Sequence, residues 1–265
     1  MPGKRCVILG SGDIGLIMAR RMTLQGAKVL ACVELMPYSS GLNRNIVQCL
    51  QDYDIPLYLS HTVVNIQGKD RLEGVTVAKV DENRKPIPGT EIQFDCDTLL
   101  LSVGLIPENE LSTGAGVKLS AVTSGAEVDD TLQTNISGIF ACGNVLHVHD
   151  LVDHVSGESF RAGRAAAAFV NGCAGGKDTW QVRDGQGVRG VVPQRICKDA
   201  GDVELMFRPA GVYRGGVCYV KCGDEIVAKK KAQIFTPGEM AVVKLPKDVI
   251  AGLNGDLTVS VEGGQ

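Results

Sequence analysis

Apolar and polar positions in the first 35 residues alternate between the pattern of a strand and that of a helix. Residues 4–9 form a short apolar run, which predicts a buried parallel strand that stops at Gly10. Residues 16–25 carry apolar side chains on several turns, which predicts a helix ended by Gly26. Residues 28–33 predict a second buried strand, with Glu34 at its end. The order is therefore strand, glycine turn, helix, strand and acid.

The glycine turn is Gly10-Ser-Gly-Asp-Ile-Gly15. In such a turn Gly10 permits the sharp bend, Gly12 lets the backbone approach a pyrophosphate, and Gly15 lets the helix pack close to the strand. The helix N-terminus offers unpaired N–H groups to phosphates. We therefore predict a dinucleotide-binding loop that includes Asp13 and Ile14, with the Asp13 side chain pointing toward the reactive end of the cofactor. The alternative is a structural glycine turn in another α/β fold.

Glu34 decides which dinucleotide the loop is expected to prefer. A carboxylate at the end of the second strand accepts hydrogen bonds from the ribose hydroxyls and repels a 2′-phosphate. The next basic residue is Arg44. The sequence therefore favours NAD over NADP.

The rest of the first domain mixes both kinds of pattern. A helix is predicted over 42–53, and strands over 56–60, 63–66, 72–80, 92–94 and 98–103. The pair 63–66 and 72–80 alternates polar and apolar residues, which predicts a small antiparallel insertion. Gly104 begins the turn that ends this unit, and we place the domain boundary at 110.

After residue 110 the pattern of apolar and polar residues changes twice. A short strand over 138–141, a turn at Gly143 and a helix over 151–170 come first. A glycine-rich linker at 172–177 follows. Beyond it, short runs predict an all-β sandwich or barrel that docks to the preceding segment or to a partner; these runs are 188–192, 203–207, 217–220, 225–228, 232–235, 241–245 and 257–261.

Composition excludes several classes of protein. Lys and Arg number 27 against 30 Asp and Glu, for a net charge of −3, and aromatic residues make up 5%. Neither value suits a nucleic-acid binder. We expect no signal peptide and no membrane span, because no apolar run approaches the length required. Nine cysteines without a CxxC pair indicate reduced thiols and a cytoplasmic location.

Three segments together resemble the pyridine nucleotide–disulfide oxidoreductase superfamily, the flavoproteins with two dinucleotide-binding domains. They are the glycine turn with Glu34, the segment 98–111 with its Gly104-Leu-Ile-Pro-Glu-Asn109 turn, and Thr134-Asn-Ile-Ser-Gly-Ile-Phe-Ala-Cys-Gly-Asn144. Their order and spacing match the family pattern, and the resemblance covers residues 1–172.

The resemblance implies an α/β fold in three parts: a Rossmann-like NAD-binding domain at 1–110, the C-terminal half of a split FAD domain at 111–172, and a small all-β domain at 173–265. It adds Gly104 to the cofactor-binding residues. It implies that Gly143 and Asn144 contact the flavin, although the family usually has Asp at position 144. The helix predicted over 151–170 would point its N-terminus at the flavin ring.

The family places the first half of the FAD domain before the NAD domain, where this chain begins. The FAD site is therefore expected to be incomplete. Two explanations stay open: the chain is a fragment, or a partner chain or self-association completes the flavin domain. The implied activity is hydride transfer between NAD(H) and flavin, with catalytic residues unknown. The alternative is a non-catalytic NAD(H)-binding structural or regulatory subunit. No disulfide motif supports thioredoxin-reductase chemistry.

Three histidines and two acids gather in His147-Val-His-Asp-Leu-Val-Asp-His154. The spacing misses the HxHxDH metal pattern by two residues, so we expect no metal. Two interpretations stay open. His147, His149 and Asp150 contact the flavin or relay a proton, or an acid of this segment caps the following helix. Among basic residues, Arg195 and Arg208 are expected on the surface, and residues 229–231 at a charged strand edge.

Overall fold

The structure is a computed structural model that describes residues 3–172 and 178–264. Its contacts divide the chain into two units, Met1–Gly104 and Leu105–Gln265, which are described separately. The three-part division at residues 110 and 172 stays a prediction. Among the described residues, no helix combines the length and the apolar composition that crossing a bilayer requires.

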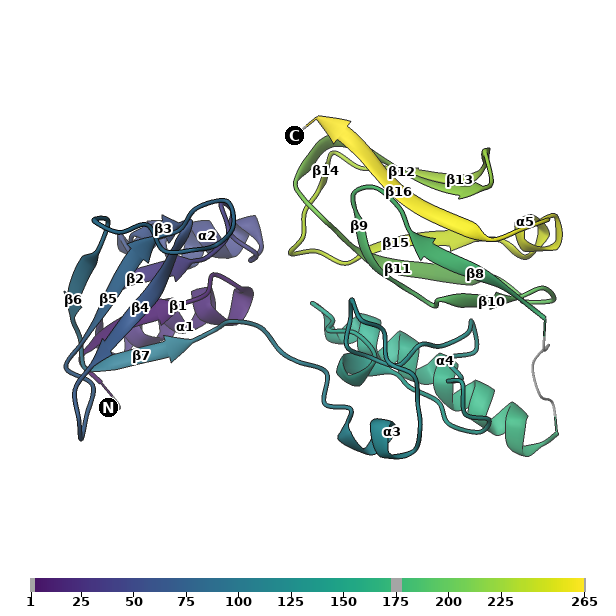
Figure 1. Ribbon diagram of the computed structural model, residues 1–265, viewed down its shortest axis with the longest axis horizontal. Coiled ribbons are helices and arrows are strands. Elements are labelled where there is room, and N and C mark those ends of the chain that lie inside the picture. The colour runs from purple at the N-terminus through teal and green to yellow at the C-terminus, as the bar shows by residue number, and fades with distance from the viewer. Residues whose placement is uncertain (1–2, 173–177, 265) are drawn as a thin grey trace. The chain divides into compact units, whose positions relative to one another are not determined.

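A four-stranded parallel sheet forms the centre of the first unit, in the order β3-β2-β1-β7 (Figure 1). Its strands are β1 (Arg5–Leu9), β2 (Lys28–Glu34), β3 (Leu57–Leu59) and β7 (Thr98–Leu101). Helices α1 (Asp13–Leu24) and α2 (Asn43–Cys49) connect them on one side. In β1, Cys6 and Ile8 join the core cluster that contains α1, whereas Val7 faces the opposite side. This alternation is the period of a strand that is buried on both faces.

The predicted antiparallel insertion is present as a three-stranded sheet, in the order β4-β5-β6. Its strands are β4 (His61–Gln67), β5 (Gly74–Lys79) and β6 (Ile92–Asp95). Val75 and Val77 of β5 pack in one core cluster with Val7 and Val33 of the parallel sheet. The insertion therefore covers the face of the parallel sheet that lacks helices.

Two helix boundaries in this unit differ from the prediction. α1 begins at Asp13, three residues early, because Gly12, with extended backbone, is the N-cap and the helix starts at the next residue. The helix predicted over 42–53 ends at Cys49 and continues only as the 3-10 turn η1 (Gln51–Tyr53). Ile55 precedes Pro56, and a residue before proline is disfavoured in helical backbone. The chain therefore leaves the helix before it enters β3.

The first part of the second unit contains α3 (Glu110–Gly114), η2 (Gly143–Val145) and α4 (Val152–Val170). A core cluster holds it together: Val117, Ala126, Val128, Leu132, Ala141, Leu146, Ala162 and Val192. The strand predicted over 138–141 was wrong, since only an isolated bridge joins Gln133 and Phe140. A strand needs a neighbour along its whole length, and the described residues supply none here.

Two sheets face each other in the remainder of this unit and confirm the predicted sandwich (Figure 1). One follows the order β10-β8-β16-β12-β13, with β14 also on β12, and the other β15-β11-β9. Their elements are β8 (Thr179–Asp184), β9 (Val188–Val192), β10 (Arg195–Cys197), β11 (Val203–Pro209), β12 (Tyr213–Cys222), β13 (Glu225–Lys231), β14 (Ile234–Phe235), β15 (Ala241–Leu245), α5 (Lys247–Ala251) and β16 (Leu257–Gly264). The prediction lacked β8, β10 and α5. β8 buries only Val182, so it carries no hydrophobic alternation to detect.

The sandwich packs directly on the preceding segment. Val192 of β9 belongs to the core cluster of that segment. The Val128 amide donates to Gln194 Oε1 at 2.9 Å, and the Cys197 amide donates to Asp130 Oδ1 at 2.6 Å. The predicted docking of the all-β domain to this segment is therefore confirmed. The charged run 229–231 ends β13, an edge strand as predicted.

Candidate functional site

The glycine loop between β1 and α1 has the geometry that its sequence predicts. Gly10 has φ +98°, and a Cβ there would lie 2.0 Å from the Ser102 carbonyl oxygen. A Cβ on Gly15 would lie 2.7 Å from the Gly10 carbonyl oxygen. Around Gly12 the nearest atom, Ser40 Oγ, is 3.8 Å from a built Cβ. Gly10 and Gly15 are thus required by close packing, whereas a Cβ on Gly12 would make only ordinary contacts.

Glu34 lies beneath this loop, with only 7% of its surface exposed. Its Oε2 accepts hydrogen bonds from the Ser11 amide at 2.9 Å and the Ser11 hydroxyl at 2.6 Å. Its Oε1 accepts from the Met36 amide at 2.9 Å. A carboxylate oxygen has room for more than one donor. Glu34 therefore fixes the loop and keeps acceptor capacity at the end of β2.

The other predicted residues of this site have different surroundings. Asp13 Oδ1 accepts from the Leu42 amide at 2.8 Å and from Asn45 Nδ2 at 2.7 Å. It therefore ties α1 to the start of α2 and does not point freely along the loop. Ile14 is 70% exposed in the first turn of α1. Gly104 has φ +100° and open space around it.

The loop fits a nicotinamide dinucleotide. No side chain caps the first turn of α1, where Gly12 is the N-cap. The N–H groups of this first turn are thus available to an anion, and the lack of a side chain at Gly12 lets a pyrophosphate approach the backbone. The residues that would hold the group are Gly12, the amides of the first turn, and Glu34 for the ribose.

The predicted flavin turn lies in the second unit. Gly143 has φ +72°, and its amide donates to Glu158 Oε2 at 2.5 Å. Asn144 is exposed, and its Oδ1 accepts from the His149 amide at 3.2 Å. Asn109 Nδ2 donates to the Val145 carbonyl at 2.7 Å, which links the 104–109 motif to this turn.

The capping interpretation of the acids before α4 was wrong. The N-cap of α4 is Leu151, and no side chain caps it. Asp150 forms an ion pair with Arg208 and accepts from the Met240 amide at 2.6 Å. Because its partners are 58 and 90 residues away in the sequence, no local pattern indicates this role.

Arg208 and Arg195 are both engaged inside the unit, which corrects their predicted surface placement. Besides Asp150, Arg208 donates to the carbonyls of Val148 at 3.0 Å and Gly238 at 2.9 Å. Arg195 Nη2 donates to the Gln133 carbonyl at 3.3 Å. Together these bonds attach the sandwich to the flavin segment.

Glu158 is the residue of this site that the sequence prediction missed. Its side chain is fully buried, with Oε1 at 2.7 Å from His147 Nε2 and Oε2 at 3.0 Å from His149 Nε2. Burial alone would raise its pKa. Hydrogen bonds from both histidines and the Gly143 amide outweigh burial and lower the pKa to about 2. Burial lowers the pKa of His147, which is therefore neutral at pH 7. The sequence did contain a signal for Glu158, because it is an acidic residue inside an alanine-rich helix.

A second Gly-x-Gly-x-x-Gly pattern occurs at Gly185–Gly190. The structure places it in the turn between β8 and β9 and in the first residues of β9, with no helix after it. The Gly190 amide donates to Asp184 Oδ2 at 2.6 Å, so a carboxylate occupies the position an anion would take. This pattern does not supply a second dinucleotide site.

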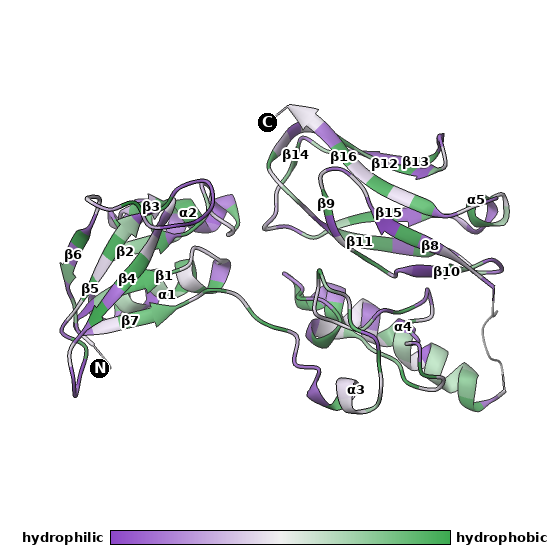
Figure 2. Cartoon of the chain, in the orientation of Figure 1, coloured by the Kyte–Doolittle hydropathy of each residue, from purple (hydrophilic) through white to green (hydrophobic). Residues whose placement is uncertain are grey.

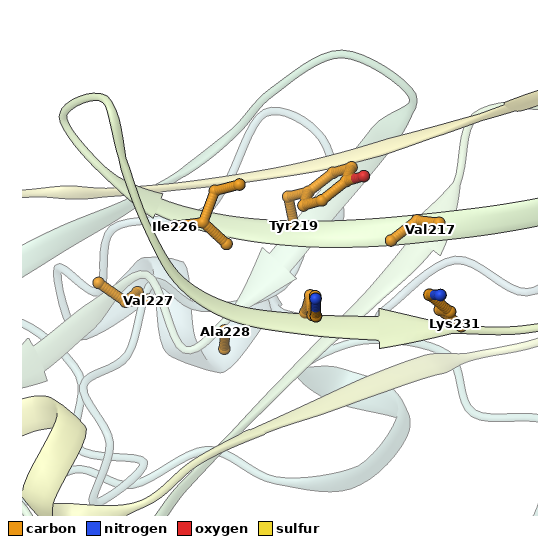
Figure 3. A pocket seen from close by; sticks show the side chains of 7 residues that line it. Val217, Tyr219, Ile226, Val227, Ala228 and Lys231 are labelled. Carbon is orange, nitrogen blue, oxygen red and sulfur yellow. The ribbon is translucent and has the colours of Figure 1, made fainter.

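A shallow hollow of about 720 Å³ lies over β12 and β13 (Figure 3). Tyr219 and Ile226 line it, together with Lys229 and Lys231. It holds no carboxylate, thiol or histidine beside these lysines. We therefore assign no chemistry to it.

Comparison with known proteins identifies the family. The family model of pyridine nucleotide-disulphide oxidoreductases matches residues 1–168, and the chain belongs to this family. Members of the family use FAD and NAD(P)H as cofactors. The predicted resemblance is thereby confirmed.

Individual relatives agree with this membership. The chain is 29% identical to an NADH oxidase of Methanocaldococcus jannaschii, over 66% of this chain and 36% of that protein. It is 28% identical to a CoA-dependent NAD(P)H sulfur oxidoreductase of Pyrococcus abyssi, over 55% of this chain and 31% of that protein. The structure of T. acidophilum thioredoxin reductase matches with a TM-score of 0.55 and 27% identity, over 63% of this chain and 53% of that one. The chain thus spans about a third of the curated relatives' length.

Proposed function

We propose that this chain is part of an NAD(H)-linked flavoprotein oxidoreductase, in which hydride passes between NAD(H) and FAD. The observation that carries the proposal is the glycine loop at Gly12, where no side chain crowds the uncapped helix start above a buried Glu34. Family membership supports the flavin part of the reaction.

The first unit binds the nicotinamide nucleotide in this proposal. The amides after Gly12 hold the pyrophosphate, and Glu34 accepts from the adenosine ribose. A 2′-phosphate would meet the buried Glu34 carboxylate, so NADH is preferred to NADPH. When bound, the two cofactors supply the hydride chemistry, and the protein orients them.

The second unit provides one side of the flavin site. Gly143 and the exposed Asn144 form the turn that contacts FAD, and His149 lies next to them through its amide bond to Asn144. The uncapped start of α4 offers N–H groups and partial positive charge, which stabilise an anionic reduced flavin.

Further polypeptide supplies the other side of the flavin site in this proposal, in a longer chain, a partner chain or a second copy of this chain. The residues of α4 support this, because hydrophobic residues, coloured green in Figure 2, occur along the helix and only Glu158 and Ala162 are buried. Val152 is 74% exposed, Phe160 71% and Val170 83%. A soluble protein covers such a surface with a partner. Seven of the described cysteines, all but Cys197, are free thiols, which supports a reducing, cytoplasmic location.

The experiment starts with the visible spectrum of the purified chain, followed by titrations with FAD, NADH and NADPH. We expect a colourless protein that binds NADH, binds NADPH at least about tenfold more weakly, and does not retain FAD. A Glu34→Gln variant should lose part of this discrimination. Failure to bind NADH would refute the proposal. Flavin bands near one per chain would refute the incomplete flavin site.

The competing function is a non-catalytic NAD(H)-binding subunit. It is favoured by the small number of described residues, Gly143, Asn144 and His149, that we expect to contact a flavin. Dye reduction by NADH, measured after adding FAD and the candidate partner, separates the two functions. Activity in the complete assembly supports the oxidoreductase, and NADH binding without any turnover supports the subunit.

A further inference from the structure

The cluster of His147, His149 and Glu158 has a donor set that the flavin function does not use. The histidines come from the loop after η2, and the glutamate from the second turn of α4. One potential ligand atom from each residue lies within 4.8 Å of the others. The exposed fractions of the three side chains are 5%, 1% and 0%.

The hydrogen bonds within the cluster use one nitrogen of each imidazole ring and leave the other nitrogen without a partner. Each ring contacts Glu158 through Nε2, while Nδ1 of His147 and Nδ1 of His149 are buried without a partner. Buried polar atoms are almost always paired, and unpaired ones indicate a missing ion or water. Two such atoms in adjacent rings, with ring centroids 4.3 Å apart, mark this as an unfinished polar site.

The cluster contains a buried negative charge. The fully buried Glu158 carboxylate accepts hydrogen bonds from His147, His149 and the Gly143 amide. The nearby Arg208 is paired with Asp150. A buried carboxylate is costly unless a cation or metal balances it. A divalent ion would provide this balance.

The distances suit ligands around one ion. Ligand atoms at about 2.0–2.2 Å from a metal lie about 3 Å from one another at the 90° angles of an octahedral ion and about 3.5 Å apart at tetrahedral angles. The Nε2–Oε separations of 2.7 and 3.0 Å are close to the first value, and an ion bound through these atoms would replace both hydrogen bonds. Two histidines and one carboxylate form a nitrogen and oxygen donor set that zinc and non-haem iron favour, with positions left for other ligands.

We propose that His147, His149 and Glu158 bind one divalent first-row transition-metal ion of the Zn²⁺ or Fe²⁺ class. The sequence pattern is His-x-His followed nine residues later by Glu, which differs from the HxHxDH metal pattern. Since Glu158 also accepts from the Gly143 amide, the ion would fix the flavin turn to α4. The site does not depend on the NAD(H) or FAD proposal.

The test uses the tag-free chain, stripped with a chelator and dialysed against Co²⁺, Zn²⁺ or anaerobic Fe²⁺. Elemental analysis should find about one ion per chain, and Co²⁺ should give visible d–d bands. His147→Asn, His149→Asn and Glu158→Gln should each weaken Co²⁺ binding at least about 100-fold. His154→Asn is the matched control, because this histidine stacks 6.3 Å from His149 but adds no ligand atom to the cluster. It should bind like the wild type.

Folding of each variant is checked by circular dichroism, and the wild-type measurement stands without the variants. Less than about 0.1 ion per folded wild-type chain at millimolar metal would overturn the proposal. Undiminished binding by folded Glu158→Gln or His147→Asn would overturn it too. A loss confined to His154→Asn would place the ion elsewhere and equally overturn it.

Discussion

Substitution of Gly12 by alanine separates nucleotide binding from folding. A Cβ at this position would meet Ser40 Oγ at 3.8 Å and Ser102 Oγ at 3.9 Å, both ordinary contact distances. The backbone, with φ −65° and ψ 164°, is open to any residue. A weaker N-cap costs a few tenths of a kcal/mol, and lower entropy of the unfolded chain offsets it. We expect the free energy of unfolding to change by less than about 0.5 kcal/mol.

Binding should respond differently, because the methyl group occupies the space left for the pyrophosphate. Overpacking of a close contact costs about 1–3 kcal/mol, which corresponds to about 5- to 150-fold in Kd. The assay is an NADH fluorescence titration, paired with urea unfolding of the same sample. A folded Gly12→Ala variant with the wild-type Kd would refute the assignment of this loop.

Two further substitutions control the comparison. Gly15→Ala places a Cβ 2.7 Å from the Gly10 carbonyl oxygen, so it should destabilise the first unit by about 2 kcal/mol or more. Gly163→Ala lies in open space on α4 and should change neither NADH binding nor, beyond about 1 kcal/mol of added helix stability, folding. If Gly12→Ala lowers the free energy of unfolding as much as Gly15→Ala does, the ordinary contact distances around position 12 are wrong.

Three other predictions concern the second unit and the thiols. Burial raises the pKa of Asp130 above its ordinary value of 3.8, so its charge lowers the stability of the fold at pH 7, and this cost disappears below about pH 4. Asp130→Asn keeps the acceptor for the Cys197 amide. In urea unfolding this variant should be more stable than the wild type at pH 7 but not at pH 3.5. Asp150→Ala leaves Arg208 without its ion pair and should lose about 1–3 kcal/mol, so a loss under about 0.5 kcal/mol would contradict the role assigned to Asp150. Burial also raises thiol pKa values, to about 12 for Cys32 and Cys218. Mass spectrometry after iodoacetamide treatment at pH 8 should therefore find these buried thiols unmodified until urea is added: Cys6, Cys32, Cys49, Cys96, Cys197 and Cys218.

The sequence alone determined the parts that depend on neighbouring residues. The strand, glycine turn and helix at residues 5–24 follow from apolar period and from the backbone freedom of Gly10. The order of three motifs indicated the family, which the family model confirmed. The sequence predicted the short strands of the sandwich wherever buried and exposed residues alternate, as in β12. It did not predict β8, which buries only one residue.

Only the tertiary structure decided which distant groups meet. Glu158 joins His147 and His149 because α4 folds back on the flavin turn, and Asp150 meets Arg208 because the sandwich docks beside it. Helix propensity carries no information about such pairings, since each depends on the packing of separate elements. The segment at 138–141 shows the converse: its residues favour a strand, but a strand forms only where another strand lies alongside it, and that neighbour is not among the described residues.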